Sequence, residues 1–516
     1  TLYQNNPQLS ALAPLAGLPQ LEWLCLDNTR VSDLSPLKSC KKLFRLSCEG
    51  LQLKEVPDFC LRQIYHFSLG DSTVARQPAA LFQLPKEEVQ AAYYDVKRVK
   101  VNEGKVIFLG ESGVGKTHTI ERIRANGAVI NFREDTTPGV KIRPYSPPGR
   151  PAVKFWDFGG QDIMQSMHHC FLTERSCYVI VVSGKDKDKV MPQAEKWLRT
   201  VAGYSRGVSV LLAVNQWHNV TAKVENEVDE QELRALCPAL KAVIYYSAVD
   251  DSPEDFNKML TKPIIDEVEK LDSVKLELPP AWAAIRDEMQ KMQEEKVDFI
   301  SFGDYLDVCA RHGLGGESEV NASIRMWLLD WFNDLGVCFS YHQGLPQGAA
   351  LMDCKVLNPD WLTNGVYRVL WNGVGCSGGG ILSRAEFKEL LTNRNLPTVD
   401  ISYRYDGDGP NYILEIMRKF RRAYVLKDDR IFIPELMGVS PPPMLAPEGR
   451  PIHCTWQLTY LPVHLLHRVT LALYEHCDGA IWRYGIRLRE GEDSLLLEAK
   501  PDERLRHLNL LRPEES

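Results

Sequence analysis

Residues 105–117 read KVIFLGESGVGKT, and this stretch decides the fold of the central part of the chain. Its first residues form the apolar, β-branched run of a buried strand. Glycines in the loop that follows let backbone N–H groups curl around phosphate oxygens at the positive end of the next helix. The stretch therefore predicts a phosphate-binding strand–loop–helix unit, with a glycine turn that binds nothing as the alternative. The loop matches the pattern GxxxxGK[ST], expected about 0.02 times by chance in a chain of this length; its residues are Gly110, Glu111, Ser112, Gly113, Val114, Gly115, Lys116 and Thr117.

Lys116 and Thr117 close this loop and suit a magnesium nucleotide, because such a lysine reaches the β- and γ-phosphates and such a hydroxyl binds Mg²⁺. A second element, WDFGGQ, follows the strand that ends near Asp157. This carboxylate can hold Mg²⁺ through a water, the N–H of Gly160 can meet the γ-phosphate, and Gln161 can orient an attacking water. The spacing of these three residues resembles the DxxGQ arrangement of Ras-like GTPases.

Thr137 is the residue expected to complete the magnesium shell. Residues 136–140 read TTPGV and lie between the two elements, in the interval where a Ras-like GTPase carries its switch threonine. Thr136 is the alternative. By itself TTPG is an ordinary turn, so this assignment depends on position alone.

The base-reading element departs from the Ras-like pattern NKxD, in which the aspartate accepts both guanine N–H donors. Here residues 215–218 read NQWH, so Asn215 is retained and His218 stands in place of the aspartate. A neutral imidazole accepts only one hydrogen bond, which predicts weakened selection of guanine. Further along, Ser247 and Ala248 match the backbone contact that the SA(K) motif makes to the base.

The elements around the loop indicate an α/β domain with a parallel sheet. Short β-branched runs alternate with stretches of helical length, which is typical of a parallel sheet covered on both faces. Ligands of such sheets bind at the carboxyl ends of the strands. The expected strands are residues 105–109, 153–158, 177–183, 208–214 and 242–247.

The first hundred residues repeat with a period of about 22, as solenoid proteins do. The frame that starts at Leu21, Leu24 and Leu26 recurs at Leu43, Leu46 and Cys48, and again at Ile64, Phe67 and Leu69. This LxxLxLxxT/N pattern is the leucine-rich repeat signature. Such repeats commonly present a concave protein-binding surface. Capping of the array against the next domain is the alternative role.

With the repeats, the P-loop and WDFGGQ in this order, the sequence resembles the Roco family, whose Ras-of-complex (Roc) GTPase domain precedes a C-terminal-of-Roc (COR) domain. The later part of the chain is similar to COR in several stretches, namely LGVCFSY at 335–341, LNPDW at 357–361, GVYRVL at 365–370, RIFIP at 430–434, YLP at 460–462 and WRYG at 482–485. The resemblance implies an α+β COR domain that mediates homodimerisation and couples it to the nucleotide state.

Composition excludes several other classes of protein. The chain has 516 residues, of which 44% are hydrophobic and 25% charged, as in ordinary globular domains. The 61 basic and 68 acidic residues leave a net charge of -7, which argues against a global nucleic-acid-binding surface. No uncharged apolar run is long enough to span a bilayer. Thirteen scattered cysteines without a CxxC pair favour a reducing, cytoplasmic environment.

The sequence therefore predicts a multidomain α/β protein in four segments: leucine-rich repeats ending a longer array at 1–95, a Roc GTPase domain at 96–272, a COR-A subdomain at 273–440 and an incomplete COR-B subdomain at 441–516. The expected function is slow, Mg²⁺-dependent hydrolysis of GTP to GDP and phosphate, coupled to COR dimerisation and to partners of the repeats. The altered NQWH motif leaves two alternatives, a scaffold that binds nucleotide weakly and an NTPase with relaxed or adenine preference.

Overall fold

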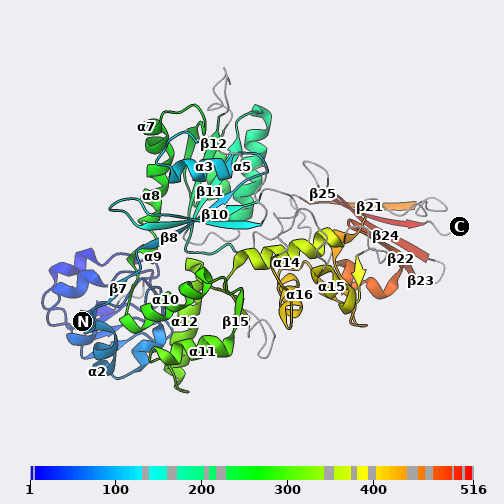
Figure 1. The fold of residues 1–516 in the computed structure, drawn as a ribbon. Helices are drawn as coiled ribbons and strands as arrows, with labels where there is room; N and C mark the ends of the chain where they lie inside the picture. The colour runs from blue at the N-terminus through cyan, green and yellow to red at the C-terminus, as the bar shows by residue number, and fades with distance from the viewer. Residues whose placement is uncertain are drawn as a thin grey trace. The chain divides into compact units, whose positions relative to one another are not determined.

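The computed structural model describes residues 2–3, 6–130, 139–159, 171–202, 208–216, 228–341, 354–373, 380–392, 402–438, 451–458, 469–490, 493–501 and 506–513. The chain divides into two compact units (Figure 1). The first comprises Thr1–Gln161, Phe171–His342 and Met352–Pro359, and the second comprises Asp162–Cys170, Gln343–Leu351 and Asp360–Ser516. Each unit is described by itself.

The first unit begins with short parallel strands that recur every 21 or 22 residues. They are β1 (Leu2–Tyr3), β2 (Trp23–Cys25), β3 (Arg45–Ser47) and β5 (His66–Ser68), paired in that order. A second pair, β4 (Gln52–Leu53) and β6 (Thr73–Val74), and the 3₁₀ turns η1 (Ala13–Gly17) and η2 (Ser35–Ser39) complete the coils. The recurring Leu24, Leu46 and Cys48 are buried in one shared core. The strand spacing and the buried positions coincide with the period of the sequence.

A connector links these coils to the central sheet. It contains α1 (Asp58–Arg62), η3 (Ala79–Gln83), α2 (Lys86–Val89), the π-helical turn η4 (Gln90–Tyr94) and β7 (Val99–Lys100). Strand β7 pairs with β14 (Glu277–Leu278), which follows the central domain in sequence. Residues 85–100, which include many charged side chains, are thus helical only in their first part.

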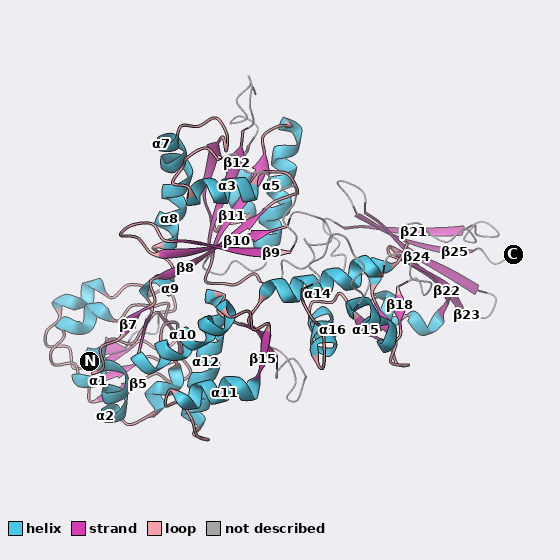
Figure 2. Ribbon diagram, in the orientation of Figure 1, coloured by secondary structure: helices cyan, strands magenta, loops and turns pink. Residues whose placement is uncertain are grey.

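The central domain is a six-stranded sheet in the order β13-β12-β11-β8-β10-β9. Five strands are parallel, namely β8 (Glu103–Leu109), β10 (Ala152–Phe158), β11 (Cys177–Ser183), β12 (Ser209–Asn215) and β13 (Leu240–Tyr246). Each lies within about two residues of a strand that the β-branched runs predict. Figure 2 shows helices on both sides of this sheet. They are α3 (Lys116–Arg124), α5 (Lys187–Ala202), α6 (Glu230–Leu236), α7 (Pro253–Phe256), the π-turn η7 (Asn257–Thr261), α8 (Lys262–Val268) and α9 (Asp272–Lys275).

The sixth strand, β9 (Val140–Tyr145), is absent from the strands that the sequence predicts. It pairs antiparallel with β10 at the edge of the sheet. Its sequence VKIRPY contains Pro144, and a proline within a strand argues for an edge position because it cannot donate to a ladder hydrogen bond. The edge location explains why the apolar content of this segment is too low to identify it as a buried strand.

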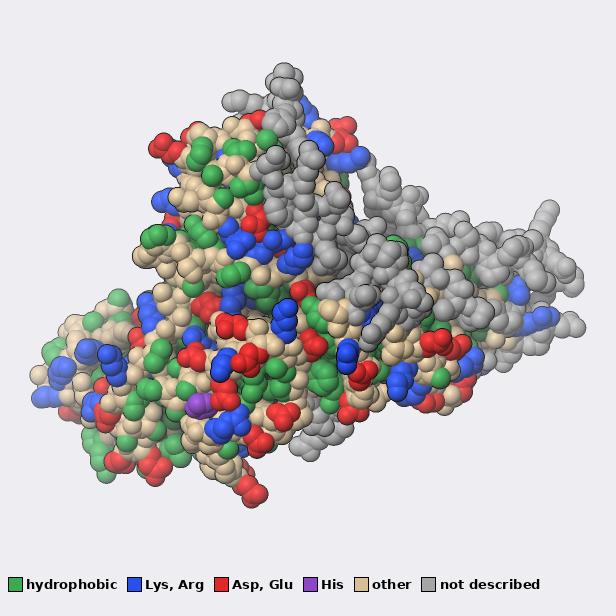
Figure 3. Space-filling model, in the orientation of Figure 1, with side chains coloured by type: hydrophobic (Ala, Val, Ile, Leu, Met, Phe, Trp, Pro, Cys, Tyr) green, Lys and Arg blue, Asp and Glu red, His purple; other side chains and the backbone are tan. Residues whose placement is uncertain are grey.

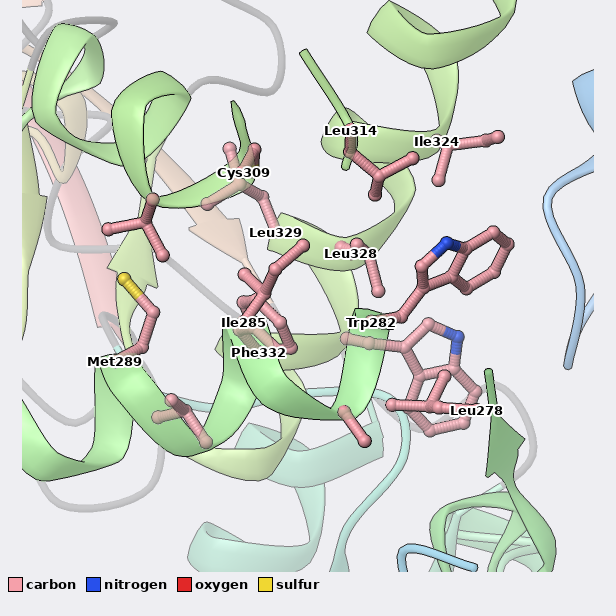
Figure 4. Close-up of a cluster of buried hydrophobic side chains, with 14 of the residues drawn as sticks. Leu278, Trp282, Ile285, Met289, Cys309, Leu314, Ile324, Leu328, Leu329 and Phe332 are labelled. Atoms are coloured by element: carbon pink, nitrogen blue, oxygen red, sulfur yellow. The ribbon is translucent and has the colours of Figure 1, made fainter. Parts of the chain in front are cut away.

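A helical layer follows in the first unit, where the sequence carries a stripe of apolar residues at helical spacing between positions 279 and 340. It contains α10 (Pro280–Glu294), β15 (Phe299–Ser301), α11 (Phe302–Arg311), α12 (Glu319–Leu335), β16 (Phe339–Ser340) and β17 (Cys354–Val356). Figure 4 shows Trp282, Ile285 and Met289 of α10 packed with Leu328 and Phe332 of α12. These side chains are buried, so the apolar stripe is a core and not an exposed interface.

The second unit contains two small sheets. Helices α14 (Pro359–Asn372), α15 (Arg384–Thr392) and α16 (Gly409–Lys419) accompany a sheet of β18 (Ile381–Leu382), β20 (Ile431–Phe432) and β19 (Tyr424–Val425), with η8 (Pro434–Leu436) after it. An antiparallel sheet has the order β21-β25-β24-β23-β22, and η9 (Tyr474–His476) precedes its strand β22. Its strands are β21 (Pro451–Leu458), β22 (Cys477–Trp482), β23 (Gly485–Glu490), β24 (Asp493–Pro501) and β25 (Arg506–Pro513).

Two of the COR-like motifs lie on hairpins of this unit. The RIFIP stretch contains β20, the second strand of the β19–β20 hairpin, and WRYG forms the turn between β22 and β23. The YLP motif at 460–462 lies outside the described residues. Among the described helices, none combines the length and the apolarity needed to cross a membrane.

Candidate nucleotide site

The glycine-rich loop connects the end of β8 to the start of α3, as its sequence predicts. Gly110, Gly113 and Gly115 all have positive φ, at 150°, 76° and 97°. A Cβ on Gly110 would lie 2.3 Å from the carbonyl oxygen of Val181, and a Cβ on Gly115 would lie 2.6 Å from Asn215 Nδ2, whereas Gly113 faces open space. The tight curl of the loop therefore requires glycine, because another residue would be strained at each position and would collide with its neighbours at two of them.

Lys116 folds back over this loop. Its Nζ lies 2.8 Å from the carbonyl oxygen of Gly110 and 2.7 Å from that of Glu111. The side chain is buried, and burial lowers the pKa of Lys116 to about 8 against the opposing pull of Asp157 and Glu111. The Glu111 carboxylate itself forms an ion pair with Lys196 of α5 at 3.1 Å. A cation is thus held at the mouth of the loop, where phosphate oxygens bind in such folds.

Asp157 lies at the carboxyl end of β10 beside the first turn of α3. It is fully buried, and burial raises the pKa of its carboxyl group, while a hydrogen bond from Thr117 and the charges of Arg143 and Lys116 lower it. A hydroxyl and a carboxylate in contact are the hard oxygen donors that Mg²⁺ prefers. Thr117 and Asp157 therefore fit a magnesium site, as the sequence predicts.

Arg143 of β9 is a second cation at this carboxylate. Its Nε lies 3.2 Å from Asp157 Oδ2, and its other arm donates to Glu121 Oε1 at 2.6 Å. Glu121, one turn further along α3, also pairs with Arg124. No linear motif points to Arg143, because the sequence does not show that β9 lies beside β10.

Asn215 joins the phosphate loop to the base-side loop. Its buried amide donates to the carbonyl oxygen of Val114 at 3.0 Å and accepts from the backbone N–H of Ala248 at 3.1 Å. The next residue, Gln216, donates its N–H to the carbonyl oxygen of Tyr246 at 2.7 Å. One side chain at the end of β12 therefore sets the position of two loops that come from different strands.

A buried arginine holds the loop at Ser247 in place through hydrogen bonds. Arg122 of α3 donates to the carbonyl oxygens of Gly127 and Ser247, both at 2.9 Å, and to that of Asp251. The N–H of Ser247 in turn donates to the Asp251 carboxylate at 2.7 Å. Sequence reasoning missed Arg122 and Asp251. The only sequence signal is that Arg122 lies among the apolar residues of α3.

The structure thus brings together one part of the predicted site. The assembled residues are Gly110, Glu111, Ser112, Gly113, Val114, Gly115, Lys116, Thr117, Asp157, Asn215, Ser247 and Ala248. The predicted Thr137, with its alternative Thr136, and Gly160, Gln161 and His218 lie outside the described residues.

Two further arginines in the same part of the sequence, Arg133 and Arg150, do not extend this set. Arg150 pairs with Asp266 at 2.5 Å and Glu269 at 2.9 Å, near the amino end of β10 and away from Asp157. Arg133 lies outside the described residues.

Comparison with protein families identifies two domains in this chain. The family described as Ras of Complex, Roc, domain of DAPkinase matches residues 105–218, and the C-terminal of Roc, COR-A domain matches residues 279–437. The first match begins in β8 and ends at the NQWH element. The second covers α10 to α12 and continues into the second unit as far as η8.

The known proteins that this chain matches are distant in sequence. The chain is 22% identical over 418 residues to a Roc-COR-CHAT protease of Runella zeae, covering 77% of this chain and 42% of that protein. It is 19% identical over 531 residues to the probable serine/threonine-protein kinase pats1 of Dictyostelium discoideum, covering 96% of this chain and 15% of that protein. The chain thus spans less than half the length of these curated relatives.

A solved structure, the Roco2 RocCORdC protein of Methanosarcina barkeri bound to GDP, matches with 25% identity and a TM-score of 0.54. The match covers 66% of this chain and 98% of that one. The glycine loop, the parallel sheet and the two matched domains agree with one another in position along the chain. A Ras-like Roc GTPase domain followed by a COR domain makes this chain a Roco-type protein.

Proposed function

We propose that this protein is a molecular switch that binds GTP and GDP with Mg²⁺ and slowly hydrolyses GTP to GDP and phosphate. The observation that carries the proposal is the convergence of three elements: the glycine loop with Lys116, the Thr117–Asp157 pair, and the Asn215–Ala248 bridge. They come from separate strands and meet at the carboxyl edge of the sheet, where α/β folds bind nucleotides.

The roles of the residues follow from their chemistry. Lys116 would exchange its loop carbonyls for phosphate oxygens, which stabilise its charge more strongly than carbonyl groups do. Thr117 and Asp157 would hold Mg²⁺, which when bound supplies positive charge against the charge that develops on the phosphate oxygens. Gln161 would position the attacking water, and Thr137 would complete the magnesium shell, on the strength of their motifs. No motif assigns an arginine to the γ-phosphate, and without such a group hydrolysis in this class is slow.

The remaining parts of the chain complete the proposal. The coils at 1–95 would form a leucine-rich repeat solenoid that binds protein partners, and the COR domain would link the nucleotide state to homodimerisation in the cytoplasm. On the face shown in Figure 3, Lys and Arg side chains are interspersed with Asp and Glu side chains over the described surface. Mixed charge of this kind suits protein partners better than nucleic acid.

A second candidate is a scaffold that binds nucleotide weakly. The NQWH sequence favours it, because His218 cannot accept both guanine N–H donors in the way that an aspartate does. An NTPase with relaxed or adenine preference would follow from the same replacement.

Titration with GDP, GTP and ATP in Mg²⁺, followed by a turnover assay, separates these functions. We expect binding of GDP at micromolar concentration and slow release of phosphate from GTP. Absence of binding at millimolar nucleotide would overturn the switch proposal in favour of the scaffold, and tighter binding of ATP than of GTP would favour the relaxed NTPase.

A double variant, Gln216→Lys with His218→Asp, tests the base-reading assignment. It restores the pattern NKxD, so GDP affinity should rise while ATP affinity stays unchanged. Unchanged GDP affinity would show that the base is held in some other way.

A further inference from the structure

Exposed aromatic side chains gather on one face of the N-terminal coils. Trp23, Phe44 and Tyr65 are 40%, 45% and 69% exposed, and they are three of the few large apolar side chains at the described surface. Phe44 and Tyr65 stack with their ring centres 5.2 Å apart and their planes within 6°. His66 meets both rings edge-on, and Arg45 lies 5.7 Å from the Trp23 ring. We call Trp23, Phe44 and Tyr65 the aromatic ridge.

The strand register explains why these residues adjoin. Trp23, Arg45 and His66 are direct neighbours across β2, β3 and β5, and Phe44 and Tyr65 precede the last two. Trp23, Phe44 and Tyr65 are exposed at adjacent positions of neighbouring coils and do not contribute to the solenoid core, which is formed by the recurring buried apolar residues. A row of exposed aromatic side chains on a solenoid is typical of a binding surface.

A floor of small side chains lies beside the aromatic ridge. Cys25, Ser47 and Ser68 are neighbours across the same three strands, two residues further along each strand. Their short side chains leave room above the sheet for another chain. Two residues earlier on the same strands lie Trp23, Arg45 and His66, whose side chains are much larger.

Acidic side chains border the floor on its other side. Asp27 accepts hydrogen bonds from Ser47 Oγ and from the N–H of Glu49, both at 2.8 Å. The Glu49 side chain extends over Gly70, and Asp71 accepts from the N–H of Gly50 at 2.8 Å. We call Asp27, Glu49 and Asp71 the acidic row. The surface therefore has an aromatic wall that also carries Arg45, a small-residue floor and a negatively charged wall, in this order along the strands.

We propose that this surface binds an extended segment of a partner protein in which apolar and basic residues alternate. Side chains of an extended chain point alternately to opposite sides. Trp23 and Asp27 are four residues apart, which is about 13 Å at the rise of a strand. The backbone of a partner segment that lies over the floor is therefore within about 7 Å of either wall. A leucine or tyrosine spans that distance toward the aromatic ridge, and a lysine or arginine spans it toward the acidic row. The inference deepens the proposed role of the repeats and is independent of the nucleotide site.

The test uses the full chain with GDP and a fluorescein-labelled peptide of sequence Gly-Leu-Lys-Tyr-Arg-Leu-Lys-Tyr-Gly, followed by fluorescence anisotropy. A peptide of the same composition with its apolar and basic residues in separate blocks is the first control. A peptide with glutamate at the basic positions is the second. The alternating peptide should bind about tenfold more tightly than either control, because only it presents both kinds of side chain to their walls.

Variants of the surface supply the decisive comparison. Tyr65→Ser and Phe44→Ser should each weaken binding of the alternating peptide about tenfold, because aromatic contacts of this size are lost. Trp371→Ser is the matched control, since Trp371 is 41% exposed but lies in the second unit, and it should leave binding unchanged. Glu49→Lys should weaken the alternating peptide and strengthen the glutamate peptide.

Three results would overturn the inference: equal binding of the block peptide, equal losses in Trp371→Ser and Tyr65→Ser, or unaltered peptide preference in Glu49→Lys. Concentration-dependent self-association that Tyr65→Ser abolishes would assign the surface to a second copy of this chain instead. GDP affinity is measured in every variant. Lost peptide binding with retained GDP affinity confines the effect to the repeats, whereas failure of the nucleotide proposal would leave peptide binding intact.

Discussion

Replacing Asn215 by alanine should disconnect the phosphate loop from the base-side loop. The Asn215 amide is the bridge between them, through the carbonyl oxygen of Val114 and the N–H of Ala248. All three residues are at most 3% exposed, so solvent reaches neither backbone group when the amide is gone. The substitution therefore leaves one buried acceptor and one buried donor without their present partner.

The expected magnitude follows from these two groups. A buried polar group that loses its partner costs about 1–3 kcal/mol, so the two together should lower the free energy of unfolding by about 2–6 kcal/mol. GDP binding then has to bring the two loops back into their relative position, and this reordering weakens binding. A weakening of about 2 kcal/mol corresponds to a loss of GDP affinity of about 30-fold. Asn215→Asp should also lower both stability and GDP affinity, without creating a cavity, because its carboxylate still accepts from Ala248 but cannot donate to Val114.

Urea unfolding and GDP titration should be measured on the same protein preparations. Asn321→Ala is the matched control, because Asn321 donates one comparable bond to the carbonyl oxygen of Gly315 in the helical layer. It should lower the free energy of unfolding by about 1 kcal/mol and leave GDP affinity unchanged. If Asn215→Ala loses no more GDP affinity than Asn321→Ala under conditions where both are folded, the bridge does not position the nucleotide loops and the reasoning is refuted.

Three other substitutions test the cations of the central domain. Lys116→Ala should abolish GDP binding in a calorimetric titration while the circular dichroism spectrum is retained; measurable GDP binding would contradict its role at the phosphates. Arg143 and Mg²⁺ compete for the Asp157 carboxylate, so Arg143→Met should let a lower Mg²⁺ concentration slow GDP release. An unchanged Mg²⁺ dependence of GDP release would count against this competition. Lys105 is fully buried, donates to the carbonyl oxygen of Phe171 at 2.9 Å, and burial lowers its pKa to about 7 from an ordinary 10.5. Between these two pKa values the unfolded chain binds the proton and the folded chain does not, so the contribution of Lys105 to the free energy of unfolding rises with pH from 7 toward 10. Urea unfolding at pH 7 and pH 9 should show a smaller rise in stability for Lys105→Met than for the unaltered protein. The same rise in both proteins would show that Lys105 does not cause it.

Much of the central domain is predictable because its signals are local. The β-branched runs form five parallel strands within about two residues of their predicted bounds, and the glycine pattern forms the expected loop. Strand β9 escaped prediction because an edge strand with a proline lacks a continuous apolar run. The GTPase resemblance, stated from DxxGQ and the P-loop, agrees with the Roc and COR-A matches.

The pairing of charges around the site was not predictable. Arg143 meets Asp157 only because an antiparallel strand returns beside β10, and Arg122 reaches Ser247 only because α3 packs beneath the end of β13. Such contacts join residues from 14 to 125 positions apart, and composition carries no signal for them. A hydrogen bond between distant residues depends on the final packing of helices on the sheet.

The sequence by itself determined the phosphate loop, the order of strands and helices, and the 22-residue period, because each depends on neighbours within one element or one repeat. Only the tertiary structure decided which side chains share a surface. The register of β2, β3 and β5 brings Trp23, Arg45 and His66 into one row. In the central sheet, the pairing of β12 with β11 and β13 brings Asn215 within reach of two loops. The physical reason is that periodicity specifies which face a side chain occupies, whereas strand pairing specifies its neighbours.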